Sequence, residues 1–194
     1  MSNLTADLFA EAEAPKALTD RLFFGLFPDA ATAARIREVG EELRRNHGLT
    51  GRVHAQDRLH VTLFHLGDYP GLPPALVKSA MAAAEVMEAA AFEVTFDHAT
   101  SFSGAPRNRP FILKGGEGLA ELCDYRQALG LALAGQGVKT TPAYTPHVTL
   151  LYDDRIIEPD PITPISWTVR ELVLVRSLIG KGVHEHIGRW RLEG

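Results

Sequence analysis

The chain has 194 residues, a formal net charge of −4, 45% hydrophobic and 23% charged residues. This composition is ordinary for a soluble globular protein with a buried core, and no apolar run is long enough to span a bilayer. The negative charge argues against a broad duplex-binding surface, although a local basic cluster could still bind one or two phosphates. Because no basic-then-apolar leader is present, we expect a cytoplasmic protein.

Residues 1–19 are predicted to form a flexible leader, because Ala, Glu and Asp dominate there and Pro15 interrupts any helix. Residues 20–194 are predicted to form a single bilobal domain. The lone cysteine, Cys123, cannot form an internal disulfide, and its helical spacing with neighbouring leucines predicts a buried side chain.

Apolar periodicity and turn residues predict an α+β order of elements. In chain order these are a strand over 21–27, a helix over 29–46, a strand over 59–67, a helix over about 74–90, strands over 92–102 and 111–114, a helix over 117–134, a strand over 144–152, and closing strands over 167–177 and 184–192. The basic, turn-rich segment 103–110 and the Pro-rich segment 158–164 are predicted to be loops.

The tetrapeptide His-Val-Thr-Leu occurs twice, at 60–63 and at 147–150. Each copy ends a strand–helix–strand unit, so the chain contains an internal repeat. Two lobes related by a pseudo-twofold axis would bring these two strands face to face.

A strand places residues i and i+2 on one face, so each copy presents a histidine beside a threonine and turns Val and Leu away. The core needs the bulk of Val and Leu but does not need an imidazole, and histidine titrates near neutral pH. Two histidines can supply an acid and a base, and two threonine hydroxyls can donate hydrogen bonds to phosphate oxygens. This set can cleave a phosphodiester without a metal.

The chain resembles the 2H phosphoesterase superfamily, and within it the bacterial RNA 2′,3′-cyclic phosphodiesterases, also called 2′-5′ RNA ligases. The matching stretches are Arg21-Leu-Phe-Phe-Gly-Leu-Phe-Pro28, Leu59–Gly67, Thr145–Leu150, Leu172–Leu178 and Gly188–Leu192. The resemblance implies a bilobal α+β fold, in which pseudo-twofold-related lobes line a central cleft with antiparallel sheets and carry their helices outside.

The resemblance also implies an activity: hydrolysis of 2′,3′-cyclic phosphate ends of RNA or nucleotides to a 2′-phosphate, without metal or cofactor, with 2′-5′ ligation as the reverse reaction. It assigns catalysis to His60 and His147 and phosphate binding to Thr62 and Thr149. The sequence leaves open which histidine is the acid. The expected partners are RNA ends or small cyclic nucleotides, the expected state is a monomer, and no membrane is involved.

Two positions depart from the family pattern. The family often has a basic residue five positions after the second histidine, where this chain has Tyr152, which can donate a hydrogen bond but carries no positive charge. A family tyrosine in the closing strand is replaced by His184, and His186 shares its strand face. These two histidines either line the cleft or face solvent.

Further candidates come from the same strands and from the basic loop. Phe64 shares the His60 face by parity and could stack on a base or belong to the core. Arg109, with Arg107 and Lys114, is either part of a solvated turn or guides RNA phosphates. By the same parity, His65 is expected to point away from the catalytic face.

Three alternatives stay open. One is a nucleotide- or RNA-end-binding module without catalysis, and another is a hydrolase of a different small cyclic phosphate. The third is a metal-dependent hydrolase with a site built from His60, His65 and Asp68, whose spacing matches no zinc pattern. Asp153 and Asp154 are expected to lie in a surface turn.

Overall fold

The structure is a computed structural model that describes residues 16–104 and 108–193. The predicted leader lies outside this part of the chain up to residue 15, as does Arg107, and residues 16–19 lead into the first strand without regular structure. The strands are β1 (Asp20–Leu26), β2 (Val61–Tyr69), β3 (Phe92–Ser101), β4 (Arg109–Lys114), β5 (His147–Asp153), β6 (Asp160–Val169), β7 (Glu171–Leu178) and β8 (Val183–Arg191). The helices are α1 (Ala30–Asn46), α2 (Pro74–Glu85) and α3 (Ala120–Gly135), with 3₁₀ turns η1 (Gln56–Arg58) and η2 (Glu117–Leu119).

The strands form one sheet in the order β6-β3-β4-β5-β2-β1-β7-β8, and every pairing is antiparallel. Its two four-stranded halves meet where β2 runs beside β5, and this seam consists of the single pair Val61 and Val148. The predicted α+β class is therefore confirmed, and the two expected sheets are joined at their centre into one.

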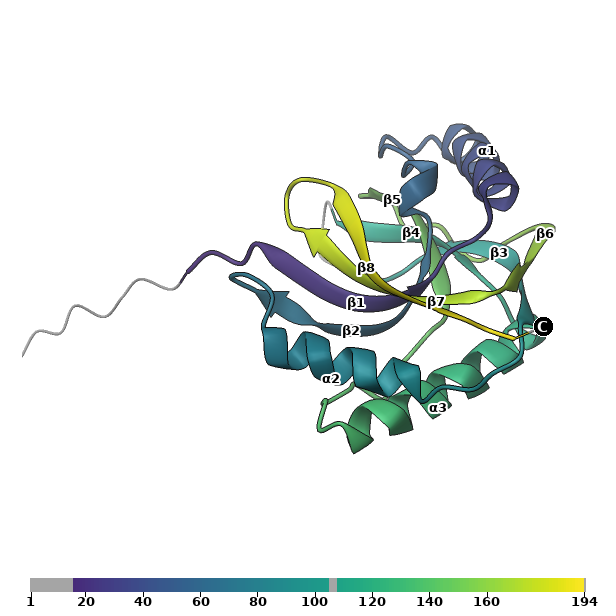
Figure 1. The fold of residues 1–194 in the computed structure, drawn as a ribbon. Coiled ribbons are helices and arrows are strands. Elements are labelled where there is room, and N and C mark those ends of the chain that lie inside the picture. Colours follow the sequence, from purple (N-terminus) through teal and green to yellow (C-terminus); the bar gives the residue numbers. More distant parts are fainter. Residues whose placement is uncertain (1–15, 105–107, 194) are drawn as a thin grey trace, which may run out of the picture.

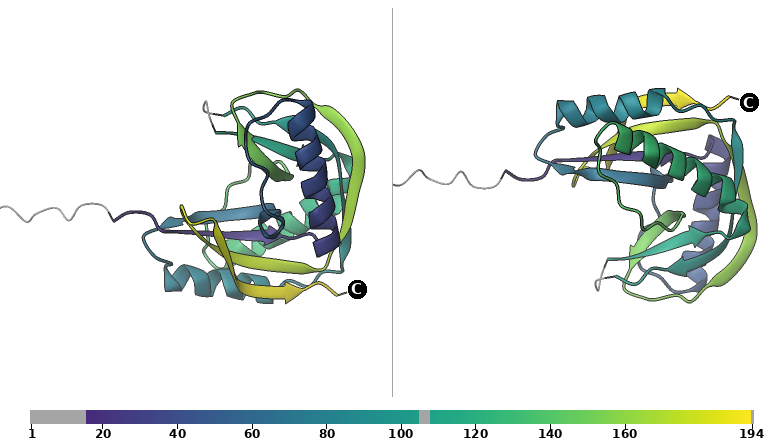
Figure 2. Two further views of the ribbon diagram at one scale, coloured as in Figure 1. Left: turned by 90° about the horizontal axis from the view of Figure 1, so that it is seen from above. Right: turned by 90° about the horizontal axis from the view of Figure 1, so that it is seen from below.

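The predicted repeat is visible in this topology, because β1–α1–β2 in one half corresponds to β4–α3–β5 in the other. Helix α1 lies on one side of the strands, and α2 and α3 lie side by side on the other (Figures 1 and 2). Helix α1 packs on β5 and β6 of the opposite half, and at Gly40 an added Cβ would stand only 3.1 Å from Val53. This close approach explains a glycine inside a helix.

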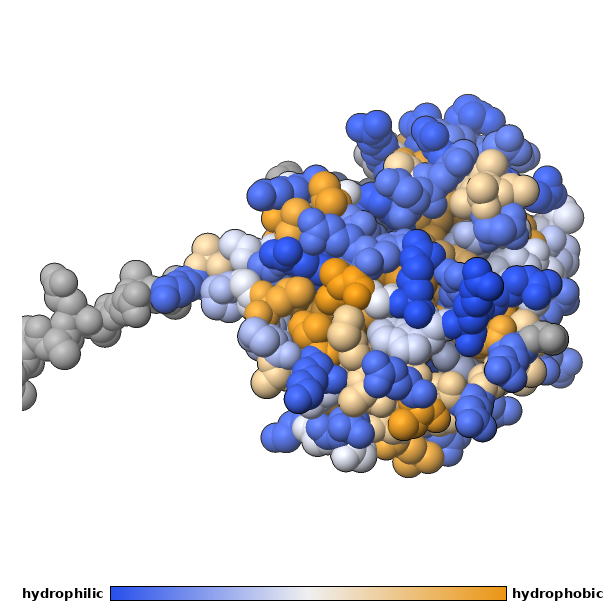
Figure 3. Space-filling model, viewed as in Figure 1, coloured by the Kyte–Doolittle hydropathy of each residue, from blue (hydrophilic) through white to orange (hydrophobic). Residues whose placement is uncertain are grey.

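The surface agrees with this layering. Hydrophilic residues dominate around α1, with some apolar residues among them, and strongly apolar residues appear over β1 and α2 (Figure 3). None of the helices in the described ranges is long and apolar enough to cross a bilayer.

Several sequence-based predictions about the fold are wrong. The strand predicted over 167–177 is parts of two strands, because β6 ends at Val169 and β7 begins at Glu171. The Pro-rich segment is not a loop, since β6 begins at Asp160 and contains Pro161 and Pro164. It is an edge strand, where the missing proline N–H groups cost little because one side of the strand has no partner. Cys123 is exposed, because α3 buries Leu122 and Tyr125 and turns the cysteine just outside that stripe.

Candidate active site

The two His-Val-Thr-Leu segments meet at the centre of the sheet. Val61 pairs with Val148, and both side chains are fully buried. Continuing this antiparallel register places His60 beside Thr149 and Thr62 beside His147. All four of these polar side chains line one cavity of about 220 Å³, which we call the central cavity. The structure thus brings together the two histidines and two threonines that the parity argument predicted.

Both imidazoles are held by the same local hydrogen bond. Nδ1 of His60 donates to the carbonyl oxygen of Arg58 at 2.7 Å, and Nδ1 of His147 donates to that of Thr145 at 2.7 Å. A carbonyl oxygen can only accept, so Nδ1 carries the proton in each ring and Nε2 is left for chemistry. Nε2 of His60 lies 3.1 Å from Oγ1 of Thr62, and when the ring is neutral it accepts a hydrogen bond from the Thr62 hydroxyl.

Aromatic rings enclose both histidines. Phe23 and Phe27 stack on His60 with centroids 4.8 and 5.3 Å away, and Phe102 meets His147 edge-on at 4.9 Å. Burial, with a smaller effect of the nearby histidines, lowers the pKa of His60 to about 3, although the hydrogen bond to Arg58 acts in the opposite direction. Burial also lowers the pKa of His147 below its usual value. Both rings are therefore neutral at pH 7 while the site is empty.

Both β2 and β5 contain a bulge directly after the His-x-Thr segment. In β2 the register shifts between the partners of Phe64 and Thr62, so Leu63 is an extra residue. In β5 it shifts in the same way at Leu150. The bulges reverse the side-chain alternation, so the residues five positions after each histidine, His65 and Tyr152, line the central cavity.

The bulge in β2 overturns one prediction and changes another. His65 was expected to face away from the catalytic side, and it lines the central cavity instead. Phe64 is only 5% exposed and belongs to the core, with the guanidinium of Arg126 stacked 4.3 Å from its ring centroid. Phe64 does not line the central cavity but a neighbouring hollow of about 370 Å³.

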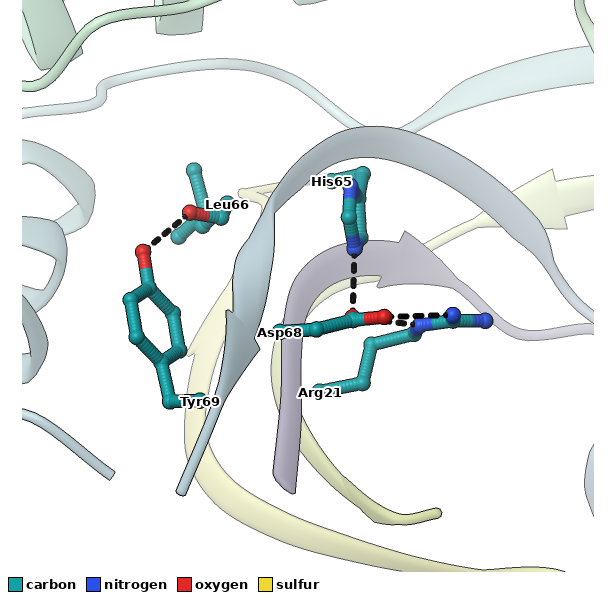
Figure 4. Close-up of polar contacts among 5 residues, drawn as sticks. All are labelled: Arg21, His65, Leu66, Asp68 and Tyr69. Carbon is teal, nitrogen blue, oxygen red and sulfur yellow. Dashed lines mark hydrogen bonds and ion pairs between the residues drawn. The ribbon is translucent and has the colours of Figure 1, made fainter. Parts of the chain in front are cut away.

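A charged cluster fixes the end of β2. Arg21 donates two hydrogen bonds of 2.8 Å to the carboxylate of Asp68, and Nε2 of His65 lies 2.9 Å from the same carboxylate (Figure 4). Tyr69 donates to the Leu66 carbonyl at 2.7 Å on the other side of the strand (Figure 4). The hydrogen bond from Arg21 holds the pKa of Asp68 far below its usual range, so this carboxylate stays ionised and neutralises Arg21.

The other predicted residues are divided between the cavity and its surroundings. His184 and Tyr152 line the central cavity. His186 lies outside it, with its ring centroid 4.5 Å from that of Phe27. Arg109 donates from Nη1 to the carbonyl of Asp154 at 2.5 Å and does not line the cavity.

Several cavity residues were missed at the sequence level: Arg21, Phe23, His54, Arg58 and Ser177. Arg58 lies only two residues before His60, but it belongs to η1, where the alternation of a strand does not apply. Arg21, Phe23 and Ser177 come from segments distant in sequence, and their placement depends on the pairing of β1 with β2 and β7. His54 is placed by its backbone N–H, which donates to the carbonyl of Leu150 on β5 at 2.8 Å.

Asp153 was expected in a surface turn and is instead 7% exposed. Burial alone would raise the pKa of its carboxyl, but N–H groups of Arg155, Gly51 and Thr50 donate to it and lower that pKa to about 2. Within the described ranges, no three His, Cys, Asp or Glu side chains are grouped to hold a metal ion, and Asp68 faces Arg21 and His65.

Comparisons with known proteins show the family and the fold. A sequence model of the 2′-5′ RNA ligase superfamily matches residues 27–180. A solved structure described as a phosphoesterase is 27% identical, with a TM-score of 0.68 over 90% of this chain and 99% of that one. E. coli LigT complexed with 3′-AMP is 28% identical, with a TM-score of 0.66 over 92% and 100%. E. coli LigT complexed with NADP+ is 26% identical, with a TM-score of 0.68 over 91% and 99%. No protein of curated function matches the chain.

Proposed function

The chain belongs to the 2′-5′ RNA ligase superfamily of 2H phosphoesterases, and from that premise we propose that it hydrolyses 2′,3′-cyclic phosphate ends of RNA or nucleotides to 2′-phosphates. One observation carries the proposal: the central cavity holds two imidazoles, each with Nδ1 fixed by a backbone carbonyl and Nε2 left for proton transfer. The complex of E. coli LigT with 3′-AMP supports a nucleotide as the kind of ligand.

The reaction follows from these two nitrogens. Nε2 of one histidine takes a proton from water while the water oxygen attacks phosphorus. The bond from phosphorus to O3′ breaks, and the protonated Nε2 of the other histidine gives its proton to O3′. Thr62 and Thr149 donate hydrogen bonds to the non-bridging oxygens, where negative charge grows. With a 5′-hydroxyl of a second chain in place of water, the same steps form a 2′-5′ phosphodiester bond while the bond from phosphorus to O3′ breaks.

Substrate binding supplies the required protonation state. In the empty site both histidines are neutral at pH 7, because burial lowers the pKa of each. A bound phosphate brings negative charge next to both rings, and a nearby opposite charge favours the protonated form. Binding of the anion therefore favours uptake of the proton that the acidic histidine later donates.

The test is hydrolysis of a 2′,3′-cyclic nucleotide and of an oligonucleotide with the same end, in EDTA, with ³¹P NMR to identify the product. We expect His60→Ala and His147→Ala each to lower turnover at least about 100-fold. His98→Ala is the matched control, because His98 pairs with Asp97 on β3 and lies outside the cavity. Near wild-type turnover in either catalytic variant would refute the two-histidine mechanism, and activity lost in EDTA would indicate a metal enzyme.

A further inference from the structure

A second hollow opens beside the central cavity. It has a volume of about 490 Å³ and is formed by the hairpin between β7 and β8 together with Arg21, Arg58 and Ser177. These last three residues also line the central cavity, so the two spaces adjoin. A ligand whose reacting group lies between the histidines can therefore extend into this space, which we call the hairpin hollow.

The hairpin hollow is strongly cationic for a protein with a net charge of −4. Its lining includes Arg21, Arg58 and Lys181 and no carboxylate. Asp68 neutralises Arg21, but neither Arg58 nor Lys181 forms an ion pair within the part of the chain that the structure describes. Two uncompensated positive charges beside one hollow attract an anion.

Arg58 also has hydrogen-bonding capacity that the protein leaves unused. Its Nε is buried and has no acceptor among the described residues. Buried donors without acceptors are rare in folded proteins and cost free energy, so such a group calls for an explanation. A guanidinium beside both spaces has the fork geometry that recognises phosphate oxygens.

The hairpin holds Lys181 next to Arg58. Gly180 and Gly182 have φ values of +77° and +67°, which glycine adopts without strain, and they form the tight turn around the lysine. The turn is fixed at one end, where the N–H of Ile179 donates to the carbonyl of Thr19 at 2.9 Å. It lies against Arg58, since a Cβ on Gly182 would be 3.3 Å from the Arg58 Nη1.

We propose that the hairpin hollow binds a second phosphate of the substrate, held by Arg58 and Lys181. This inference rests on the proposed function. A ribonucleotide with its 2′,3′-cyclic phosphate between His60 and His147 carries its other phosphate at the 5′ position. The preferred substrates are therefore RNA ends or 5′-phosphorylated nucleotides, rather than cyclic nucleotides without a 5′-phosphate.

The experiment compares cytidine 2′,3′-cyclic monophosphate with its 5′-phosphorylated form, using wild type, Lys181→Gln and Lys139→Gln. Lys139 is an exposed lysine that lines neither space. The wild type should show a kcat/KM about tenfold higher for the 5′-phosphorylated substrate, which is typical of one charged hydrogen bond. Lys181→Gln should bring that ratio close to one, and Lys139→Gln should leave it unchanged. An equal ratio in wild type and Lys181→Gln overturns the proposal.

A binding measurement separates this inference from the proposed function. By calorimetry, cytidine 3′,5′-bisphosphate should bind the wild type about tenfold more tightly than cytidine 3′-monophosphate, and Lys181→Gln should remove the difference. If neither cyclic substrate is hydrolysed but the bisphosphate preference is present, the proposed function fails and the phosphate site stands. If hydrolysis occurs and both ligands bind equally, the hairpin hollow is not a phosphate site.

Discussion

His184 meets His60 edge-on, with ring centroids 5.3 Å apart and an interplanar angle of 77°. Its Nδ1 is buried without a hydrogen-bond partner among the described residues. Burial, with a smaller effect of the positive charge of Arg58, lowers the pKa of His184 to about 4. At neutral pH His184 is therefore uncharged, and its ring packs edge-on against His60 and restricts the position of that imidazole.

A tyrosine should replace His184 without much loss, because an aromatic edge is what the site uses. We expect His184→Tyr to keep kcat/KM for a cyclic nucleotide within about twofold of wild type, and His184→Ala to lower it about three- to tenfold, since an aromatic pair contributes about 0.5–1.5 kcal/mol. Steady-state kinetics on the three proteins checks this. If the tyrosine variant is as weak as the alanine variant, the imidazole itself is needed.

We expect kcat/KM, which reports on the free enzyme, to be highest at acidic pH. The proposed mechanism requires one neutral and one protonated histidine, and burial lowers both pKa values below 6.5. As pH rises through the higher of the two, the protonated acid is lost, so kcat/KM should peak below pH 6.5. The kcat profile should lie at higher pH, because the bound anion raises both pKa values. A kcat/KM maximum above pH 7.5 would contradict this reasoning.

Asp153 should matter for stability rather than for chemistry. It accepts hydrogen bonds from the N–H groups of Thr50, Gly51 and Arg155, and an asparagine would turn its amide toward one of these donors. We expect Asp153→Asn to lower the free energy of unfolding by about 1–3 kcal/mol in urea denaturation at pH 7, and Asp154→Asn, at the exposed neighbour, to change it by less than about 0.5 kcal/mol.

The same carboxylate gives a pH signature. Its pKa is lowered to about 2 in the folded protein, so its contribution to stability is full above the unfolded pKa near 3.9 and is lost as pH falls toward 2. The difference in unfolding free energy between wild type and Asp153→Asn should therefore shrink between pH 5 and pH 2. A difference that stays constant over this range would show that the ionised form is not what stabilises the loop.

Phe64 offers a test between a packing role and base stacking. Because its ring is buried under Arg126, Phe64→Leu should lower the free energy of unfolding by about 1–2 kcal/mol while leaving KM for cyclic nucleotides within about twofold. Denaturation and steady-state kinetics on the same preparation measure both. A large rise in KM with unchanged stability would instead support stacking on a base.

The fold class, the repeat and the facing of the two His-x-Thr segments could be predicted because each depends on local periodicity. The face occupied by His65 could not, because parity assumes a regular strand and the bulge at Leu63 breaks it. Bulges insert one residue without a distinctive sequence, so the error appears only beyond the insertion. The same shift at Leu150 brings Tyr152 to the cavity.

Other features depend on contacts in the folded protein that cannot be predicted from local sequence. The prolines of β6 indicate a loop until the strand is known to be at the sheet edge. The absence of a basic residue at position 152 indicated weak charge near the phosphate. The structure places Arg58, from the turn η1, in the same cavity, and Arg58 has no ion-pair partner among the described residues.

The pairing of Val61 with Val148 has a consequence for how the enzyme fails. Each half of the sheet contributes one histidine and one threonine, so each holds only half of the proposed acid–base pair, and one backbone pair aligns the two halves at the seam. A small opening at this seam would separate donor from acceptor while nearly every hydrogen bond within each half persisted. Catalysis should therefore be lost before the circular dichroism spectrum changes during denaturation. Turnover is then a more sensitive measure of the alignment of the two halves than secondary structure content.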